Sequence, residues 1–159
     1  MKLVIVVCHF KEDLTWLKDI KHDVIVYNKN PKEADLYEIN LPNVGFDTIV
    51  YLKYIIDNYD NLPDYVCFSQ DNPFYHCPRF IQKVNEFDFT KKFHPLGISY
   101  IRSVDHIVKE TIDYADSIGI KYELPIMFIN SAQCIVSKEL ILMREKESYQ
   151  KIKDSIPNQ

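Results

Sequence analysis

Leu3-Val4-Ile5-Val6-Val7 is the stretch that decides the fold class of this chain. The run is apolar, largely β-branched and uninterrupted, which is typical of a strand buried on both faces of a parallel sheet. After a polar loop, Leu14, Leu17 and Ile20 follow at helical spacing. Residues 24–27 are again apolar and predict a second strand. A strand, a short helix and a strand in this order form a compact βαβ unit.

The rest of the chain continues this alternation. Apolar residues recur at steps of three and four from Phe46 to Tyr59, which predicts an amphipathic helix. Similar patterns predict strands over 64–68, 98–101, 124–129 and 133–136, and helices over 14–20, 78–87, 105–118, 137–141 and 145–156. Residues 28–31 predict a turn, and residues 31–43 and most of 93–101 predict irregular loops. No repeat or linker interrupts the chain, so we expect one α/β domain over residues 1–159.

Composition excludes several classes of protein. The formal net charge is −4, with 19 Lys and Arg against 23 Asp and Glu, and the basic residues are scattered. Nucleic-acid binding is therefore not expected, because it depends on a basic surface. No apolar stretch approaches the ~20 residues of a membrane span. The four cysteines contain no C-x-x-C pair, so we expect free thiols and a cytoplasmic protein.

Polar residues follow three of the predicted strands. These residues are His9, Phe10, Lys11, Glu12 and Asp13 after the first strand, Asn28, Lys29 and Asn30 after the second, and Ser69, Gln70, Asp71 and Asn72 after the third. In open parallel sheets, ligands bind beyond the carboxyl ends of the strands. The sequence therefore predicts a ligand site where these three loops converge.

The glycine count limits what that site can be. Only Gly45, Gly97 and Gly119 are present, so neither a P-loop nor a dinucleotide fingerprint is possible. A phosphate ligand would have to be held by side chains, a helix N-terminus or a divalent metal bridging to carboxylates. Asp71 is the best-placed carboxylate for such an ion, with Glu12 and Asp13 as the second choice.

Each of these residues also has a purely structural interpretation. Asp71-Asn72-Pro73 has the composition of a turn, and Glu12 and Asp13 open a predicted helix, where acidic residues are favoured in any case. Two catalytic motifs are absent from the sequence. The histidines form no H-x-x-x-H pair for zinc, and no serine lies in a G-x-S-x-G motif.

Several blocks resemble a small family of glycosyltransferase-like proteins. Residues 6–17, VVCHFKEDLTWL, are similar to that family's VVARYNEDLSWL, and Phe68-Ser69-Gln70-Asp71-Asn72-Pro73-Phe74 is similar to its FLQGNPF. Residues 131–137, SAQCIVS, resemble its late motif GAQFxVS. Further similar blocks are residues 26–29, 41–45 and 54–64. The blocks occur in the family's order over nearly the whole chain.

The family resembles the GT-A class and the N-terminal glycosyltransferase domain of a chlorella-virus protein. The resemblance implies a Rossmann-like, mostly parallel sheet flanked by helices, a nucleotide-sugar donor with a UDP-sugar as first choice, and Mn²⁺ or Mg²⁺. By position, His9, Phe10, Glu12 and Asp13 would line the base and ribose pocket, and Asn28 and Lys29 would hold the nucleotide. Gln70, Asp71 and Asn72 would occupy the metal and diphosphate position, with Asp71 as metal ligand and catalytic residue.

The sequence departs from the class in ways that leave alternatives open. Residues 70–72 offer one carboxylate where the class commonly has two, and the late motif has Ser131 in place of glycine. The acceptor is not indicated, and His76, Asp105 and Glu123 are equal candidates for the catalytic base. The leading hypothesis is a glycosyltransferase. The alternatives are a non-catalytic nucleotide- or glycan-binding module and a phosphate-handling hydrolase that uses Asp71.

Overall fold

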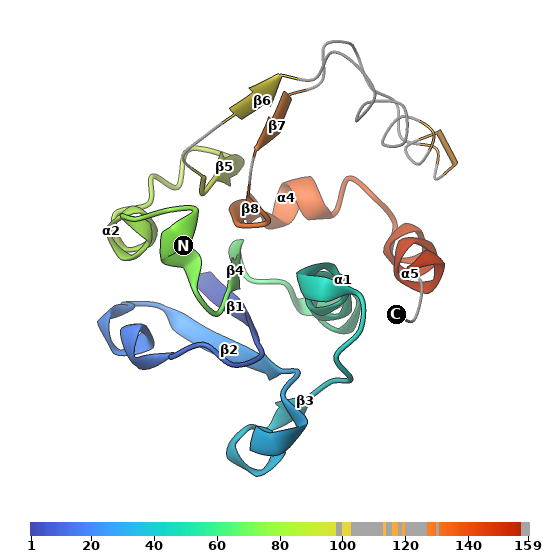
Figure 1. Cartoon of the computed structure of the whole chain (residues 1–159). Helices are drawn as coiled ribbons and strands as arrows, with labels where there is room; N and C mark the ends of the chain where they lie inside the picture. The colour runs from blue at the N-terminus through green and yellow to red at the C-terminus, as the bar shows by residue number, and fades with distance from the viewer. Residues whose placement is uncertain are drawn as a thin grey trace.

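A six-stranded sheet in the order β3-β2-β1-β4-β8-β5 organises the computed structural model of the protein (Figure 1). The structure describes residues 1–97, 100–102, 113, 116–117, 119, 127–129 and 131–156. The strands of this sheet are β1 (Leu3–His9), β2 (Asp23–Asn28), β3 (Ile39–Asn40), β4 (Tyr65–Gln70), β5 (Phe93–Pro95) and β8 (Cys134–Ser137). β6 (Tyr100–Arg102) and β7 (Met127–Ile129) pair antiparallel in a second, two-stranded sheet.

Helical segments connect these strands. The α-helices with bounds in the described part of the chain are α1 (Phe46–Asn58), α2 (Phe80–Asn85), α4 (Lys138–Ile141) and α5 (Lys146–Ser155). The 3₁₀ segments in the same part of the chain are η1 (Thr15–Asp19), η2 (Pro31–Leu36), η3 (Tyr59–Asn61) and η4 (Pro73–Tyr75). Within these ranges, no helix is long and apolar enough to cross a membrane.

β1 lies inside the sheet, as its unbroken apolar run predicts. It pairs parallel to β2 on one side and to β4 on the other, and all seven of its residues are buried. β2 and β3 are also parallel, whereas β8 runs antiparallel to both β4 and β5. The prediction of an α/β fold with a mostly parallel sheet flanked by helices is therefore confirmed.

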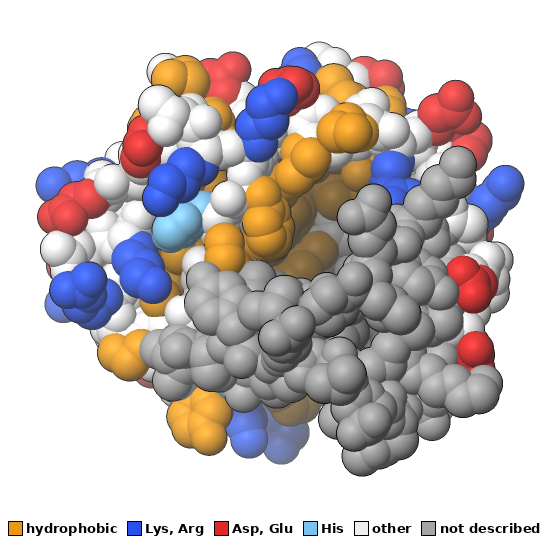
Figure 2. Space-filling model, turned by 90° about the horizontal axis from the view of Figure 1, so that it is seen from above, with side chains coloured by type: hydrophobic (Ala, Val, Ile, Leu, Met, Phe, Trp, Pro, Cys, Tyr) orange, Lys and Arg blue, Asp and Glu red, His pale blue; other side chains and the backbone are white. Residues whose placement is uncertain are grey.

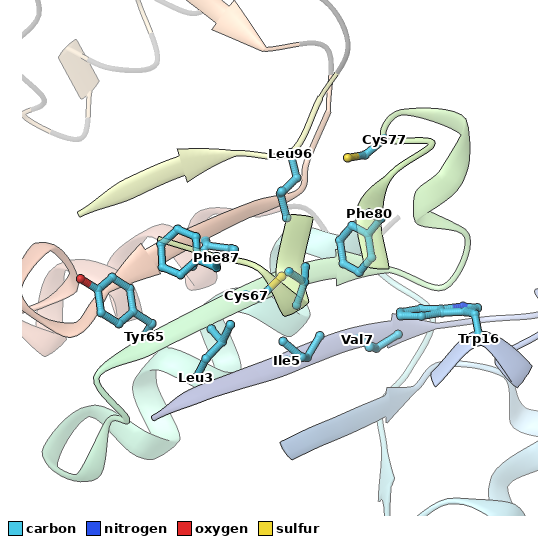
Figure 3. Packing of buried hydrophobic residues seen from close by; sticks show 12 residues of the cluster. Leu3, Ile5, Val7, Trp16, Tyr65, Cys67, Cys77, Phe80, Phe87 and Leu96 are labelled. Carbon is cyan, nitrogen blue, oxygen red and sulfur yellow. The ribbon is translucent and has the colours of Figure 1, made fainter. Parts of the chain in front are cut away.

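Alternate residues of β1 face two separate hydrophobic cores. Leu3, Ile5 and Val7 belong to the first core, together with Trp16 of η1 and Phe80 of α2 (Figure 3). Val4, Val6 and Cys8 belong to the second core, with Val50, Tyr54 and Ile55 of α1. This alternation follows from the two-residue period of a strand. The sheet is thus covered on both faces, with α1 and α2 on opposite sides of it (Figure 1).

The connections reverse direction between β1 and β4. β1 leads to β2 through η1, which packs on the first core, whereas β3 leads to β4 through α1, which packs on the second. A sheet wound in both directions from neighbouring strands has a topological switch point between them. The loops that follow β1 and β4 therefore separate at this point of the carboxyl edge.

Some local predictions need correction. The predicted helix over 14–20 is only the 3₁₀ turn η1, and the predicted loop over 31–43 contains η2 and β3. The segment predicted as mostly irregular over 93–101 contains β5, which pairs with β8. The predicted helix over 105–118 falls largely outside the described residues. In a view from above, hydrophobic side chains line a hollow in the surface of the described part (Figure 2).

Candidate functional site

The carboxyl ends of β1, β2 and β4 meet at one edge of the sheet. In the strand register His9 is opposite Asn28, and Cys8 is opposite Gln70. The three polar loops that the sequence singles out are therefore neighbours in space. Their side chains, however, differ in the groups that they contact.

Asp71 holds the loop after β1 against the end of β4. Its Oδ2 accepts hydrogen bonds from the backbone N–H groups of Phe10, Lys11 and Glu12 at 3.0, 3.1 and 3.1 Å. Its Oδ1 accepts one from the N–H of Asn72 at 3.0 Å, and its own carbonyl accepts one from Trp16 Nε1 at 2.9 Å. Burial raises the pKa of Asp71, but these four N–H groups outweigh it and the pKa is lowered.

His9 lies buried between two carboxylates from different loops. Its Nε2 donates to Glu33 Oε2 at 2.9 Å, while its Nδ1 lies 3.6 Å from Asp71 Oδ2. The His9 side chain is 3% exposed, and Nδ1 has no hydrogen-bond partner in the described part of the chain. The Tyr37 ring lies against the imidazole with centroids 5.0 Å apart. His9 thus links the loops after β1, β2 and β4.

Asn28 and Lys29 are buried at the end of β2. The Asn28 amide donates to Asn40 Oδ1 and to the Asn30 carbonyl, so it ties β2 to β3. The Lys29 ammonium donates to the carbonyl oxygens of Val44 and Phe46 at 2.7 and 2.8 Å. Lys29 is only 3% exposed, so its charge is directed at the backbone carbonyls that lead into α1 and not at solvent.

Gln70 connects the end of β4 to the start of α1. Its Nε2 donates to Asp47 Oδ2 at 2.6 Å. The Cys8 thiol lies in the same group, and burial, followed by the effect of the Asp47 carboxylate, raises its pKa well above the usual value. A thiol in these surroundings is held neutral and is not a nucleophile.

A hollow opens at the topological switch point, between the loops after β1 and β4. Its volume is about 280 Å³. It is lined by Glu12, Asp13, Thr15, Trp16, Asp71, Asn72 and Phe74. We call it the switch-point hollow. Four of the predicted site residues, Glu12, Asp13, Asp71 and Asn72, therefore line this one hollow. Phe10, which is 40% exposed, is close to Glu12 in the sequence.

The polar groups of this hollow differ in how free they are. Asp13 accepts hydrogen bonds from the backbone and hydroxyl of Thr15, and these two bonds lower its pKa. Asn72 Oδ1 accepts from the N–H of Phe74 and caps η4. The Glu12 carboxylate has no hydrogen bond or ion pair within the described ranges, which leaves it available to a ligand. Trp16 and Phe74 meet edge to face at 5.8 Å and form the apolar wall.

The donor set does not fit a metal ion held by the protein alone. Both oxygens of Asp71 are occupied by amides, and Asp13 is occupied by Thr15. Among the residues that the structure describes, no three or more His, Cys, Asp or Glu side chains are grouped so as to hold a metal. Mn²⁺ or Mg²⁺ at Asp71 stays a prediction that a direct binding measurement can test.

The late motif supports the site from the neighbouring strand. The Gln133 side chain is 1% exposed, and its Nε2 donates to the carbonyl of Pro73 at 3.2 Å. Its Oε1 accepts from the Ser69 hydroxyl at 3.3 Å. Ser131 stands where the similar motif has glycine. Its Oγ accepts from the N–H of Gln133 and donates to the carbonyl of Leu96, so the serine adds two hydrogen bonds to the motif.

Sequence reasoning missed Glu33 and Asp47. Glu33 falls in the predicted loop, yet Asn30, Pro31 and Glu33 follow a helix-start pattern in which Asn caps, Pro opens and Glu closes back. In the structure Asn30 Oδ1 accepts from Lys32 N. Glu33 Oε1 accepts from Asn30 Nδ2, and not from the Asn30 backbone N–H, which donates to Asn28 Oδ1. Of the three candidates for the catalytic base, His76 is half-buried beside Tyr75, while Asp105 and Glu123 lie outside the described residues.

Comparison with known proteins identifies a family but no activity. No curated protein matches the sequence. One similar solved structure is the crystal structure of 4-diphosphocytidyl-2C-methyl-D-erythritol synthase from Anaerococcus prevotii, at 9% identity and a TM-score of 0.49, over 97% of this chain and 76% of that one. A likeness of this size assigns no function. The family model described as "Protein of unknown function (DUF3431)" matches residues 4–93, more than half of the chain, and the protein therefore belongs to this family.

Proposed function

We propose that the protein binds a nucleotide-sugar, with a UDP-sugar as first choice, at the switch-point hollow and transfers the sugar to an acceptor. The observation that carries this proposal is the position of the hollow. It lies beyond the carboxyl ends of β1 and β4, where the chain winds in opposite directions, and this is where open α/β sheets bind their ligands.

The side chains of the hollow suit the sugar and base parts of such a ligand. The free carboxylate of Glu12 is an acceptor for ribose hydroxyl groups. Trp16 and Phe74 offer an apolar wall, and Phe10 offers a partly exposed ring for stacking. Sites for small ligands commonly combine an apolar wall with a few placed polar groups in this way.

The buried polar residues have positioning roles in this proposal. Asp71 fixes the loop that carries Glu12, and His9 holds Glu33 by a hydrogen bond and lies 3.6 Å from Asp71. Asn28, Lys29 and Gln70 fix the ends of β2 and β4 against β3 and α1. Transfer then depends on holding the two reactants in register, with a base on the acceptor side that removes the hydroxyl proton.

A second candidate is a non-catalytic nucleotide- or glycan-binding module. The engagement of Asp71 favours it, because the carboxylate that would meet a metal or act as a nucleophile is bonded to four N–H groups. The same observation counts against a phosphate-handling hydrolase that uses Asp71. Donor binding without turnover would distinguish the binding module from the transferase.

Calorimetry with UDP-, GDP-, dTDP- and CMP-sugars tests the proposal, each with Mn²⁺, with Mg²⁺ and with a chelator. A ligand at about 100 times its Kd adds roughly 2.7 kcal/mol to the free energy of unfolding, which a thermal shift detects. Comparing metal and chelator tests the metal prediction. Product analysis by mass spectrometry then separates transfer from binding alone.

Two variants locate the binding site. Glu12→Gln removes the free carboxylate of the hollow. It is expected to lower the affinity for the nucleotide-sugar about tenfold, as the loss of a charged hydrogen bond does. Glu38→Gln changes an exposed residue directly before β3, outside the hollow, and this control should bind the donor normally. If no nucleotide-sugar binds under any condition, or if both variants bind equally well, the switch-point hollow is not the donor site.

A further inference from the structure

A second hollow, separate from the switch-point hollow, lies between α2 and β5. Its volume is about 230 Å³. Its lining includes Arg79, Lys83, Lys91 and His94, together with Glu86 and Asp88. No residue lines both hollows. We call this second one the cationic hollow.

The two acidic residues of the cationic hollow are bonded to neutral donors. Glu86 Oε2 accepts from the amide of Gln82 at 3.0 Å. The Asp88 carboxylate accepts from the backbone N–H and the hydroxyl of Thr90, at 3.0 and 2.9 Å. These bonds, followed by the nearby Lys91 charge, lower the pKa of Asp88. Neither acid forms an ion pair with a cation of the hollow within the described ranges.

The cations of the hollow therefore form no ion pair with these two acids, although the Lys91 charge acts on Asp88. Elsewhere in the protein lysines do pair, as Lys53 does with Asp57 at 2.7 Å and Lys92 with Glu139 at 2.5 Å. Arg79, Lys83 and Lys91 have no such partner in the part of the chain that the structure describes. Three cations without an ion pair thus gather around one hollow, together with two acids, in a chain whose net charge is −4.

His94 lies close to these cations and is affected by their charge. It is half-buried in β5, with its ring 5.8 Å from that of Phe87. Burial lowers its pKa first, and the charges of Lys91 and Lys83 lower it further. The potential is thus felt at a side chain that can itself donate a hydrogen bond to an anion.

We propose that the cationic hollow binds an oxyanion of the phosphate class. Guanidinium and ammonium groups with no internal partner form strong, charge-assisted hydrogen bonds to phosphate oxygens. The lining combines half-buried Lys83 and His94 with exposed Arg79 and Lys91, and these four groups match a small ligand that carries two or more negative charges. This site does not depend on what the switch-point hollow binds.

The test is calorimetric titration of the protein with inorganic pyrophosphate. The double variant Lys83→Gln/Lys91→Gln removes two cations of the hollow, and Lys32→Gln/Lys151→Gln removes two exposed lysines elsewhere. The first variant is expected to bind pyrophosphate at least about tenfold more weakly, and the second within about twofold of the parent. The imidazole resonance of His94, followed by NMR, is expected to shift on binding.

Further arms separate the sources of the anion and the two sites. Vesicles containing phosphatidic acid replace pyrophosphate in a sedimentation assay, so that binding there alone identifies a lipid headgroup as the source. Glu12→Gln should bind pyrophosphate like the parent. The proposal is overturned if neither pyrophosphate nor the vesicles bind, if the two double variants lose affinity equally, or if Glu12→Gln changes the affinity while Lys83→Gln/Lys91→Gln does not. An affinity that depends on Glu12 alone would place the anion in the switch-point hollow, whereas the other outcomes leave the test of nucleotide-sugar binding unchanged.

Discussion

At Asp71, burial and hydrogen bonding pull the pKa of the carboxyl group in opposite directions. Its side chain is 15% exposed, yet four N–H groups favour the charged form and the pKa is lowered. A lowered pKa in the folded state adds stability that is present above the unfolded pKa of about 4. This stability is lost as the pH falls through the folded value.

The Asp71→Ala substitution is expected to lower the free energy of unfolding by about 2 to 4 kcal/mol, since it leaves the amides of Phe10, Lys11 and Glu12 without their acceptor. Asp71→Asn should cost less, because one oxygen remains. Urea unfolding as a function of pH measures both effects. The gap between the parent and Asp71→Asn should shrink below about pH 4. An equal cost for the exposed control Asp35→Ala would contradict this role.

Gly45 has a backbone conformation that a side chain resists. Its φ is +62°, and a Cβ there would lie 2.1 Å from Ile49 Cγ1 and 3.0 Å from Ile156 Cγ2. Gly45→Ala should therefore cost both the left-handed strain of about 1–2 kcal/mol and a steric clash. Gly119→Ala is the matched control, because its φ is +71° with no atom within 4 Å of the added Cβ. Thermal unfolding that ranks the two variants equally would show that the clash is relieved at no cost.

Among the elements, the end of β2 and the start of α1 depend on one buried ammonium group. Lys29 joins the carbonyls of Val44 and Phe46, on either side of Gly45. Phe46 has a strained backbone, with a φ of +51°. Its side chain is 83% exposed and so packs little against the protein. The tie therefore holds a strained segment that its own side chain does not anchor.

The Lys29→Met substitution keeps the length of the side chain and removes both hydrogen bonds. We expect a loss of about 1 to 3 kcal/mol in the free energy of unfolding. Faster amide hydrogen exchange should appear in the first turn of α1, because the loop before it is released. Lys53→Met, at an exposed i,i+4 ion pair of α1, is the control and should change stability by less than about 0.5 kcal/mol. Unchanged exchange in α1 would contradict the proposed tie.

For the whole molecule, long-range periodicity predicted the fold well and local chemistry predicted it less well. The apolar run of β1 and the periodic pattern of α1 are strong because burial on two faces or on one stripe leaves a clear signature. β3 and β5 have two and three residues, too few to show a period, and their pairing depends on neighbours distant in sequence. η2 was missed although its capping residues are local and readable.

The candidate site was predictable in position but not in bonding. Residues at strand ends had to converge once the sheet was parallel. Whether Asp71 faces a ligand or three amides depends on the path of the loop at Phe10–Glu12, which no spacing in the sequence encodes. The same holds for Lys29, whose burial follows from where the chain enters α1.

Ionisable groups in the two cores set the stability of the whole molecule at high pH. Burial raises the pKa of Cys134, Tyr27 and Tyr54 to about 12, and raises that of Cys67 as well. In the unfolded chain thiols and phenols ionise near 9.0 and 10.0. A raised folded pKa of an acidic group means that the folded state binds more protons at high pH. Stability is therefore full below the unfolded pKa and is lost above it.

The free energy of unfolding should accordingly fall as the pH rises above about 9, by up to about 1.4 kcal/mol per pH unit for each group that stays neutral only when folded. Urea unfolding between about pH 8 and pH 10.5 measures this slope. Cys134→Ala removes one such group and should reduce the slope by up to about 1.4 kcal/mol per pH unit. Tyr75→Phe, a substitution at an exposed tyrosine, should leave the slope unchanged. A slope that is zero, or the same in both variants, would mean that these thiols and phenols reach water in the folded protein.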